Sequence, residues 1–259
     1  MPEGWDGQVG QAGRTGRVME RVALEARRRG GQADVRDVCA AAVDTLPVDG
    51  AGISLMSTPA MRHVLHTTDR ISGELEELQL TLGEGPCVDV ISSGAPVLTG
   101  DLSRAELRER WPSFAPAAHA AGAGAFFALP LSAGTRSPGV LDLYAARTGP
   151  LRGEVLADAL AFAEAATMLL LLASPGIGTV QGAGPEGMEE ALGYDQYRAE
   201  IDQAVGMLTE QMSAGVEEVA VRLRAYAYAQ ARTLADVAVE VVARRLRFGP
   251  DGTARCEGQ

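Results

Sequence analysis

The sequence contains no lysine and no asparagine, so all 23 of its Lys or Arg positions are arginine. Both missing residues have AT-rich codons, and their absence indicates a GC-rich genome rather than a selected chemistry. The formal net charge of −11 over 259 residues argues against a protein that binds nucleic acid along its whole surface. Any contact with a polyanion must therefore be local.

Cysteine is also scarce. The three cysteines, Cys39, Cys87 and Cys256, form neither a metal-binding motif nor a disulfide framework, which favours a reducing compartment. The Gly-rich N-terminus lacks an apolar signal core, and the most apolar run, 165–173, is too short to span a bilayer. We therefore expect a cytoplasmic protein with no membrane partner.

Catalytic motifs are missing as well. His63 and His66 lie three residues apart on a predicted strand and His119 is alone, so the histidines form no catalytic or metal-binding set. The Gly-x-Gly patterns at Gly176 and Gly182 lie in a predicted linker and follow no strand, and there is no Gly-rich phosphate loop, nucleophile elbow, phosphoacceptor helix or ATP-binding domain. Cys87 opens a helix and is either a reactive thiol or a packed cysteine. We expect no enzyme, no metal and no required cofactor.

The chain length predicts two compact domains. Residues 1–15 are predicted to be disordered, and helical patterns follow from Gly16 and over 35–46. The hydrophobic period then changes to two, which predicts strands at 51–57, 62–67, 96–99, 125–131 and 139–145. Further helices are predicted at 71–82, 86–93, 114–121 and 151–172. The fold class over 16–173 is therefore α+β, with helices flanking an antiparallel sheet.

Two segments in this region, LGEGPCVDVISSGAPVLTGDL and ALPLSAGTRSPGVLDLYA, resemble a GAF domain of the actinobacterial type. The resemblance implies a sensory module that often binds a small ligand between the sheet and its covering helices. The sequence does not say whether the signal is a small molecule or a protein. The pocket walls would be Ile53, Leu55, Leu65, Cys87, Phe126, Leu141 and Leu143. The same residues suit a filled hydrophobic core, which is the alternative interpretation.

A Gly- and Pro-rich segment, 174–187, is predicted to be a linker. A helical pattern resumes at Met188, and three amphipathic helices are predicted between Tyr194 and Phe248. Thr233-x-x-Asp236 has the form of a capping box before the third helix. The second domain therefore spans 188–248, with a disordered tail at 249–259. Small residues are expected to let its helices approach closely: Ala204, Gly206, Ala220, Ala227 and Ala238.

One face of the second helix is not explained by packing. At about 100° per residue, Glu217, Val221, Arg224 and Tyr228 lie opposite the apolar stripe. An aromatic side chain beside an arginine on an exposed face suits base stacking and phosphate contact. The alternative interpretation is a solvated face on an ordinary helical bundle.

The stretch IDQAVGMLTEQM, followed by EEVAVRLRAYAYAQARTLADVAVEVVARRL, resembles the ANTAR domain, the RNA-binding module of bacterial transcription antiterminators. The resemblance covers 194–248, and many members carry a lysine where this chain has Val205. It implies that a homodimer binds hairpin loops in nascent transcripts and prevents the terminator hairpin from forming. The predicted RNA-binding residues are Gln203, Gly206, Met207, Arg222, Arg224, Tyr228, Arg232, Arg244 and Arg245.

Together the two resemblances predict a GAF–ANTAR transcription antitermination regulator, with a three-helix ANTAR bundle after the sensory domain. The alternative is a protein–protein signalling module without RNA binding. Because the linker composition predicts flexibility, we expect a signal to act by changing dimerisation or by docking the RNA-binding face against the sensory domain.

Overall fold

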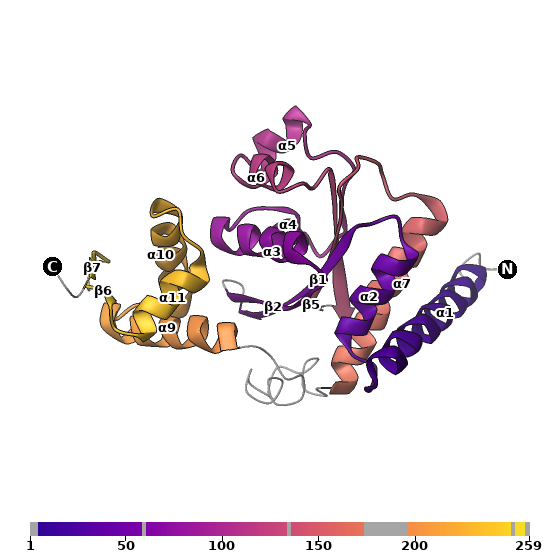
Figure 1. Cartoon of the computed structure of the whole chain (residues 1–259), viewed down its shortest axis with the longest axis horizontal. Coiled ribbons are helices and arrows are strands. Elements are labelled where there is room, and N and C mark those ends of the chain that lie inside the picture. The colour runs from indigo at the N-terminus through magenta and orange to yellow at the C-terminus, as the bar shows by residue number, and fades with distance from the viewer. Residues whose placement is uncertain (1–4, 59–60, 134–135, 174–195, 250–251, 257–259) are drawn as a thin grey trace.

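The computed structural model describes residues 5–58, 61–133, 136–173, 196–249 and 252–256 (Figure 1). The predicted linker and the helical pattern expected from Met188 lie outside these residues. Two parts are visible in Figure 1: a sheet domain, comprising the described residues up to 173, and a C-terminal bundle, comprising the described residues from 196 onward.

The sheet domain is built on five antiparallel strands in the order β2-β1-β5-β4-β3. The strands are β1 Gly50–Thr58, β2 Met61–Thr67, β3 Val97–Thr99, β4 Ala125–Ala133 and β5 Arg136–Ala145. These positions confirm the strands predicted from the period of two. The antiparallel α+β class is confirmed with them.

One face of the sheet is covered by α2 Val35–Thr45 and α7 Gly153–Ala173, and α1 Trp5–Arg29 packs against these two helices. The prediction of disorder over 1–15 is wrong for residues 5–15, which belong to α1. This helix is fixed to α7, because Arg14 forms an ion pair of 2.5 Å with Asp158 and the Thr15 hydroxyl donates to Glu164 at 2.6 Å. Composition alone did not reveal these partners, which are about 150 residues away in sequence.

Helix α7 is the one described helix that is long and apolar enough to cross a membrane by length and composition. The run at 165–173 is therefore only part of a longer apolar helix. In the structure α7 packs on β4 and against α1, and its buried residues include Phe162 and Leu170. This packing accounts for the buried apolar side chains, whereas Met168 and Leu172 of the same helix are exposed.

The other face of the sheet carries α3 Arg70–Leu82, α4 Pro86–Ser93, α5 Ala105–Arg110 and α6 Phe114–Ala120. Helix α3 begins with a capping box between Asp69 and Ser72 and ends at Gly83, whose φ of +66° favours glycine. Phe114 makes edge-to-face contacts with Trp111 and Phe126. The sequence predicted α3, α4 and α6 but not the short α5.

The C-terminal bundle consists of α9 Gln196–Met212, α10 Val216–Ala229 and α11 Leu234–Val242, followed by β6 Leu246–Phe248 and β7 Ala254–Cys256. Three helices were predicted there, and the Thr233 hydroxyl caps α11 by accepting from the Asp236 N–H at 3.0 Å. Four of the five small residues are buried between the helices. Gly206 is not, because an added Cβ would meet nothing within 4 Å. The predicted disordered tail is wrong for 254–256, since β7 pairs with β6.

A charged cluster is buried beneath α3. Arg62 of β2 donates to the Glu76 carboxylate at 2.7 Å and to the Glu76 carbonyl at 2.8 Å, and lies 3.8 Å from the Asp142 carboxylate. Within the described part of the chain, Glu76 Oε1 and Asp142 Oδ1 have no hydrogen-bond partner. Gly52 makes room for the cluster, because a Cβ there would lie 2.7 Å from Glu76 Oε1.

Two carboxylates thus face one guanidinium in a buried site. Burial raises the pKa of Asp142 well above its ordinary value, and the neighbouring Glu76 carboxylate raises this pKa further. A raised pKa favours the protonated form of Asp142, whose O–H can donate a hydrogen bond. Arg62 and Glu76 then remain the closest ion pair of the cluster, at 2.7 Å.

Asp142→Asn should therefore gain stability relative to the wild type as the pH rises above about 4, where an unfolded aspartate ionises. The folded wild type keeps this proton after the unfolded chain has lost it, so wild-type stability falls with pH by up to about 1.4 kcal/mol per unit until the folded pKa is passed. Urea unfolding at a series of pH values between about 5 and 8 measures the difference. A difference that does not change across the series would show that Asp142 is ionised in the native state.

Candidate nucleic-acid interface and its contact with the sheet domain

The seven residues of the predicted ligand pocket do not line one pocket. Ile53, Leu55, Leu65, Leu141 and Leu143 pack in the core beneath α1, α2 and α7, whereas Cys87 and Phe126 pack on the opposite face beneath α3, α4 and α6. Phe126 lies between Ala125 and Phe127, which face the other core, because neighbouring strand positions point to opposite faces of a sheet, and Cys87 belongs to α4 on the same side as Phe126. All seven side chains are buried, as the filled-core alternative requires.

Cys87 is a packed residue within the charged cluster. Its sulfur lies 2.9 Å from Arg62 Nη1 and 3.7 Å from the Ser54 hydroxyl. Burial raises the pKa of the Cys87 thiol well above its ordinary value, although the charge of Arg62 acts in the opposite direction. A buried, neutral thiol is a poor nucleophile, which favours the packed alternative. Among the described residues, no group of His, Cys, Asp and Glu is arranged to hold a metal ion.

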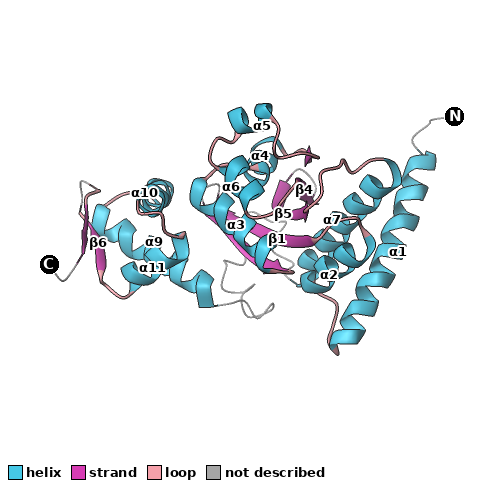
Figure 2. Ribbon diagram, turned by 45° about the horizontal axis from the view of Figure 1, so that its top comes forward, coloured by secondary structure: helices cyan, strands magenta, loops and turns pink. Residues whose placement is uncertain are grey.

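Helix α3 lies between the sheet and the C-terminal bundle (Figure 2). Its inner face carries Glu76 of the charged cluster, and its outer face contacts the bundle through Glu77 and Leu80. The Glu77 carboxylate accepts from the Leu234 N–H at 3.0 Å, at the first turn of α11, and from the Thr81 hydroxyl at 3.1 Å. Leu80 is 9% exposed and packs within the hydrophobic core of the bundle. The sheet domain and the bundle are therefore in direct contact, through one hydrogen bond and one packed leucine.

Typical free-energy contributions show which of the two contacts, that of Leu80 or that of Glu77, stabilises the interface more. Burying a leucine side chain contributes about 1.5–3 kcal/mol. A carboxylate at a helix N-terminus contributes about 0.3–1 kcal/mol. Leu80 is thus the main source of affinity between α3 and the bundle, and Glu77 fixes the orientation of α11. A second contact lies nearby, where His63 Nε2 of β2 is 3.6 Å from the Asp202 carboxylate of α9.

Beside this contact is an open groove of about 720 Å³ between α3 and the turn that joins α10 to α11. Its α3 wall includes Leu78 and Leu82, and its bundle wall includes Tyr228 and Ala235. Surface ion pairs border it: Arg70 with Glu74 at 2.7 Å on α3, and Arg232 with Glu240 at 3.0 Å on the bundle.

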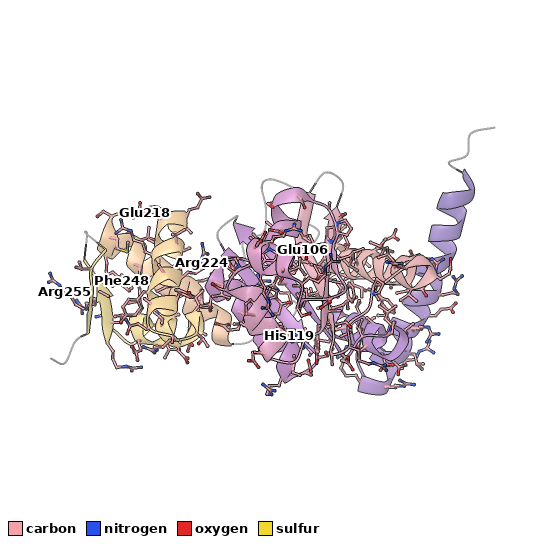
Figure 3. The ribbon with its side chains drawn as sticks, turned by 90° about the horizontal axis from the view of Figure 1, so that it is seen from above. Glu106, His119, Glu218, Arg224, Phe248 and Arg255 are labelled. Atoms are coloured by element: carbon pink, nitrogen blue, oxygen red, sulfur yellow. The ribbon has the colours of Figure 1, made fainter. Side chains whose placement is uncertain are left out.

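Three of the predicted RNA-binding residues lie at this contact. Tyr228 is 60% exposed and lines the groove. Arg224 points toward the sheet domain (Figure 3), and its Nε lies 3.6 Å from the position of an added Cβ on Gly83. It is half-buried rather than fully exposed, and burial lowers the pKa of its guanidinium. Arg232 completes the group at the turn after α10. Glu217 and Val221 are exposed on α10, as predicted.

The remaining predicted residues are elsewhere on the bundle. Arg222 lies on a different side of α10 from Arg224, forms an ion pair of 2.5 Å with Glu218, and approaches Gly252. Gln203 and Gly206 are exposed on α9, and Met207 is half-buried against the bundle core. Arg244 and Arg245 are exposed beyond α11. The predicted set is therefore divided among several surfaces.

Val205 is 4% exposed and packs in the bundle core. At this position the chain uses its side chain for packing, so the nearby arginines must supply any phosphate contact. The contact residues Glu77 and Leu80 were missed by sequence reasoning. Their signal was the presence of leucines on more than one face of α3, at Leu75, Leu78, Leu80 and Leu82.

Comparisons with known proteins bear on the sheet domain. The GAF domain family model matches residues 32–169, just over half of the chain. No curated protein matches the chain.

Similar solved structures include two GAF domains and one enzyme. The GAF domain of Acinetobacter phosphoenolpyruvate-protein phosphotransferase is 13% identical, with a TM-score of 0.46, and the match covers 64% of this chain and 95% of that one. The GAF-B domain of DevS from Mycobacterium smegmatis is 19% identical, with a TM-score of 0.40 and coverage of 54% and 93%. The type II free methionine-R-sulfoxide reductase from Thermoplasma acidophilum is 15% identical, with a TM-score of 0.39 and coverage of 52% and 87%.

Identities below 20% and TM-scores below 0.5 assign no function to this chain. The family model, by contrast, matches the region that forms the five-stranded sheet and its covering helices. The chain belongs to the GAF domain family.

Proposed function

We propose that this GAF protein is a signal-responsive RNA-binding regulator, in which the C-terminal bundle acts as an ANTAR-type module. The bundle would bind hairpin loops in nascent transcripts as a homodimer and promote transcription antitermination. GAF domains are typically sensory, and the described residues of this one supply no catalytic constellation, so we assign it the role of sensor. The observation that carries the proposal is the exposed aromatic ring of Tyr228 beside Arg224 on α10.

Packing does not account for this ring. The inward face of α10 is formed by Val219, Ala220, Leu223 and Ala227, all of which are buried. Tyr228 is next in sequence to Ala227 but keeps 60% of its surface exposed. An exposed aromatic face suits base stacking, which contributes about 1–3 kcal/mol per base. The neighbouring guanidinium of Arg224 suits a phosphate oxygen.

The contact with α3 supports regulation of this surface. Arg224 is half-buried beside Gly83, and the approach to Tyr228 runs through the groove bordered by α3. RNA that stacks on Tyr228 and reaches Arg224 must compete with α3 for the same space. A signal that favours the separated arrangement would therefore raise RNA affinity, up to the difference in its own affinity for the two arrangements.

The alternative function is a protein–protein signalling module without RNA binding. It is favoured by one observation, namely that this face of the bundle already contacts a protein surface, α3. Measuring the binding of the full chain to a pool of fluorescein-labelled RNA stem-loops with randomised loops separates the two. RNA binding that weakens as salt rises supports the proposal, whereas no binding at low salt supports the alternative.

Tyr228→Ala should weaken binding to this pool by about 5- to 150-fold, the equivalent of one lost base stack. Thermal stability should change little, because the ring is mostly exposed. Val221→Ala is the matched control, since Val221 is 54% exposed on the same face of α10 two turns earlier. Equal affinities for the two variants, measured by fluorescence anisotropy, would remove Tyr228 from the RNA site.

Loosening the α3 contact should strengthen RNA binding. We expect Leu80→Ala to raise affinity by on the order of tenfold and Glu77→Gln by about two- to fivefold, in the order of their contributions to the contact. Glu74→Gln is the control on the same helix, because Glu74 pairs with Arg70 and not with the bundle. If Glu77→Gln instead weakens binding while the fold is retained, α3 is part of the RNA site and does not compete with it.

A further inference from the structure

The short hairpin after α11 is anchored to the bundle by alternate residues of β6. Leu246 and Phe248 are buried, whereas Arg247 between them is exposed. The Phe248 ring packs edge-to-face on Tyr226 with centroids 5.3 Å apart, and its N–H donates to the Gln211 side chain at 3.1 Å. These contacts fix which way the hairpin faces, so the direction of Arg247 follows from the packing of its neighbours.

The pairing of the two strands places arginines opposite each other. Arg247 of β6 is in register with Arg255 of β7, and both are exposed. Residues directly opposite in an antiparallel pair share a face, and like charges at such positions are destabilising. Arg244 and Arg245, also exposed, stand immediately before β6. Four arginines are thus concentrated in the 12 residues from Arg244 to Arg255 of a chain whose net charge is −11.

The hairpin is far from the contact with α3. Figure 1 shows β6 and β7 at the end of the bundle that points away from the sheet domain, and Figure 3 shows Arg255 at that end and Arg224 at the other. The hairpin surface therefore stays open when the face bearing Arg224 is held against α3.

We propose that the β6–β7 hairpin is a second RNA contact, which binds the phosphate backbone through Arg247 and Arg255. This inference rests on the proposed function and extends it to a surface outside the ANTAR resemblance. Guanidinium groups bind phosphate oxygens in a bidentate manner, and both arginines are exposed on the hairpin. The buried Phe248 offers no ring for base stacking, so the hairpin binds RNA without sequence preference while Tyr228 contacts bases.

The position of the hairpin determines which of the two RNA contacts, the arginine pair or Tyr228, forms first. Because the arginine pair is accessible in the docked arrangement, it captures RNA before the bundle separates from α3. The captured RNA is then held close to Tyr228, which raises its effective concentration for competition with α3. An acidic surface on another protein would satisfy the same charges, but RNA is favoured because the adjacent bundle already carries a stacking residue.

The test compares two charge-matched double variants of the full chain. Arg247→Gln/Arg255→Gln removes the hairpin pair, and Arg147→Gln/Arg152→Gln removes two exposed arginines from the sheet domain, with the same change in net charge. Both are titrated with the fluorescein-labelled stem-loop pool at several salt concentrations, after circular dichroism has confirmed the fold. A third variant, Arg247→Lys/Arg255→Lys, keeps both charges and should retain most of the binding.

We expect the hairpin variant to lose on the order of tenfold in affinity and to reduce the slope of log Kd against log salt by about 1.4 to 1.8, which corresponds to two phosphate contacts. The control should match the wild type. If the wild type binds and both glutamine variants bind equally well or equally poorly, the hairpin inference is wrong and the proposed function stands. If the wild type itself binds no RNA, the proposed function fails and the inference fails with it. Altered oligomeric state in the hairpin variant, with unchanged RNA affinity, would assign the arginines to a protein contact instead.

Discussion

The structure depends on a helix that is packed on two sides. Adjacent residues of α3 contact different neighbours: Glu76 is buried against Arg62 beneath the helix, and Glu77, about 100° further round the helix, accepts the Leu234 N–H of the bundle. Leu80 continues the outer face into the bundle core. Because packed interiors are close to solid density, α3 cannot shift on the sheet without disturbing its contact with α11. The helix therefore joins the interior of the GAF domain to the surface proposed to bind RNA.

This arrangement explains how the GAF domain, whose predicted pocket residues are packed in two cores, can influence the bundle. Hydrophobic residues pack on both faces of its sheet, and the Arg62 guanidinium beneath α3 donates to the Glu76 carboxylate and carbonyl. A signal needs only to favour a different position of α3, and its effect is limited by its differential affinity for the two positions. Separation would uncover Arg224 and Tyr228, while the arginine hairpin is accessible throughout.

Local patterns predicted most of the elements, and tertiary partners explain the failures. The period of two located the five strands, and the helical period located α3, α7 and the three bundle helices. Residues 5–15 belong to a helix whose Arg14 and Thr15 contact α7 through partners such as Asp158, which composition does not reveal. The predicted ligand pocket combined residues from both sides of the sheet. They were chosen for their hydrophobicity and not for the side of the sheet on which each position lies. The α3 contact and the arginine hairpin required strand register and interdomain packing, which a single sequence does not encode in a local pattern.

Hydrogen exchange at the Leu234 amide tests the central claim most directly, because this N–H is bonded to Glu77 across the two parts of the chain. NMR of the full chain, with and without a saturating amount of the stem-loop pool, would follow it alongside core amides of the sheet domain. The account predicts that RNA accelerates exchange at Leu234 and leaves the core amides unchanged. Unaltered protection at Leu234 while RNA is bound would show that the bundle binds RNA without leaving α3, and would contradict the account.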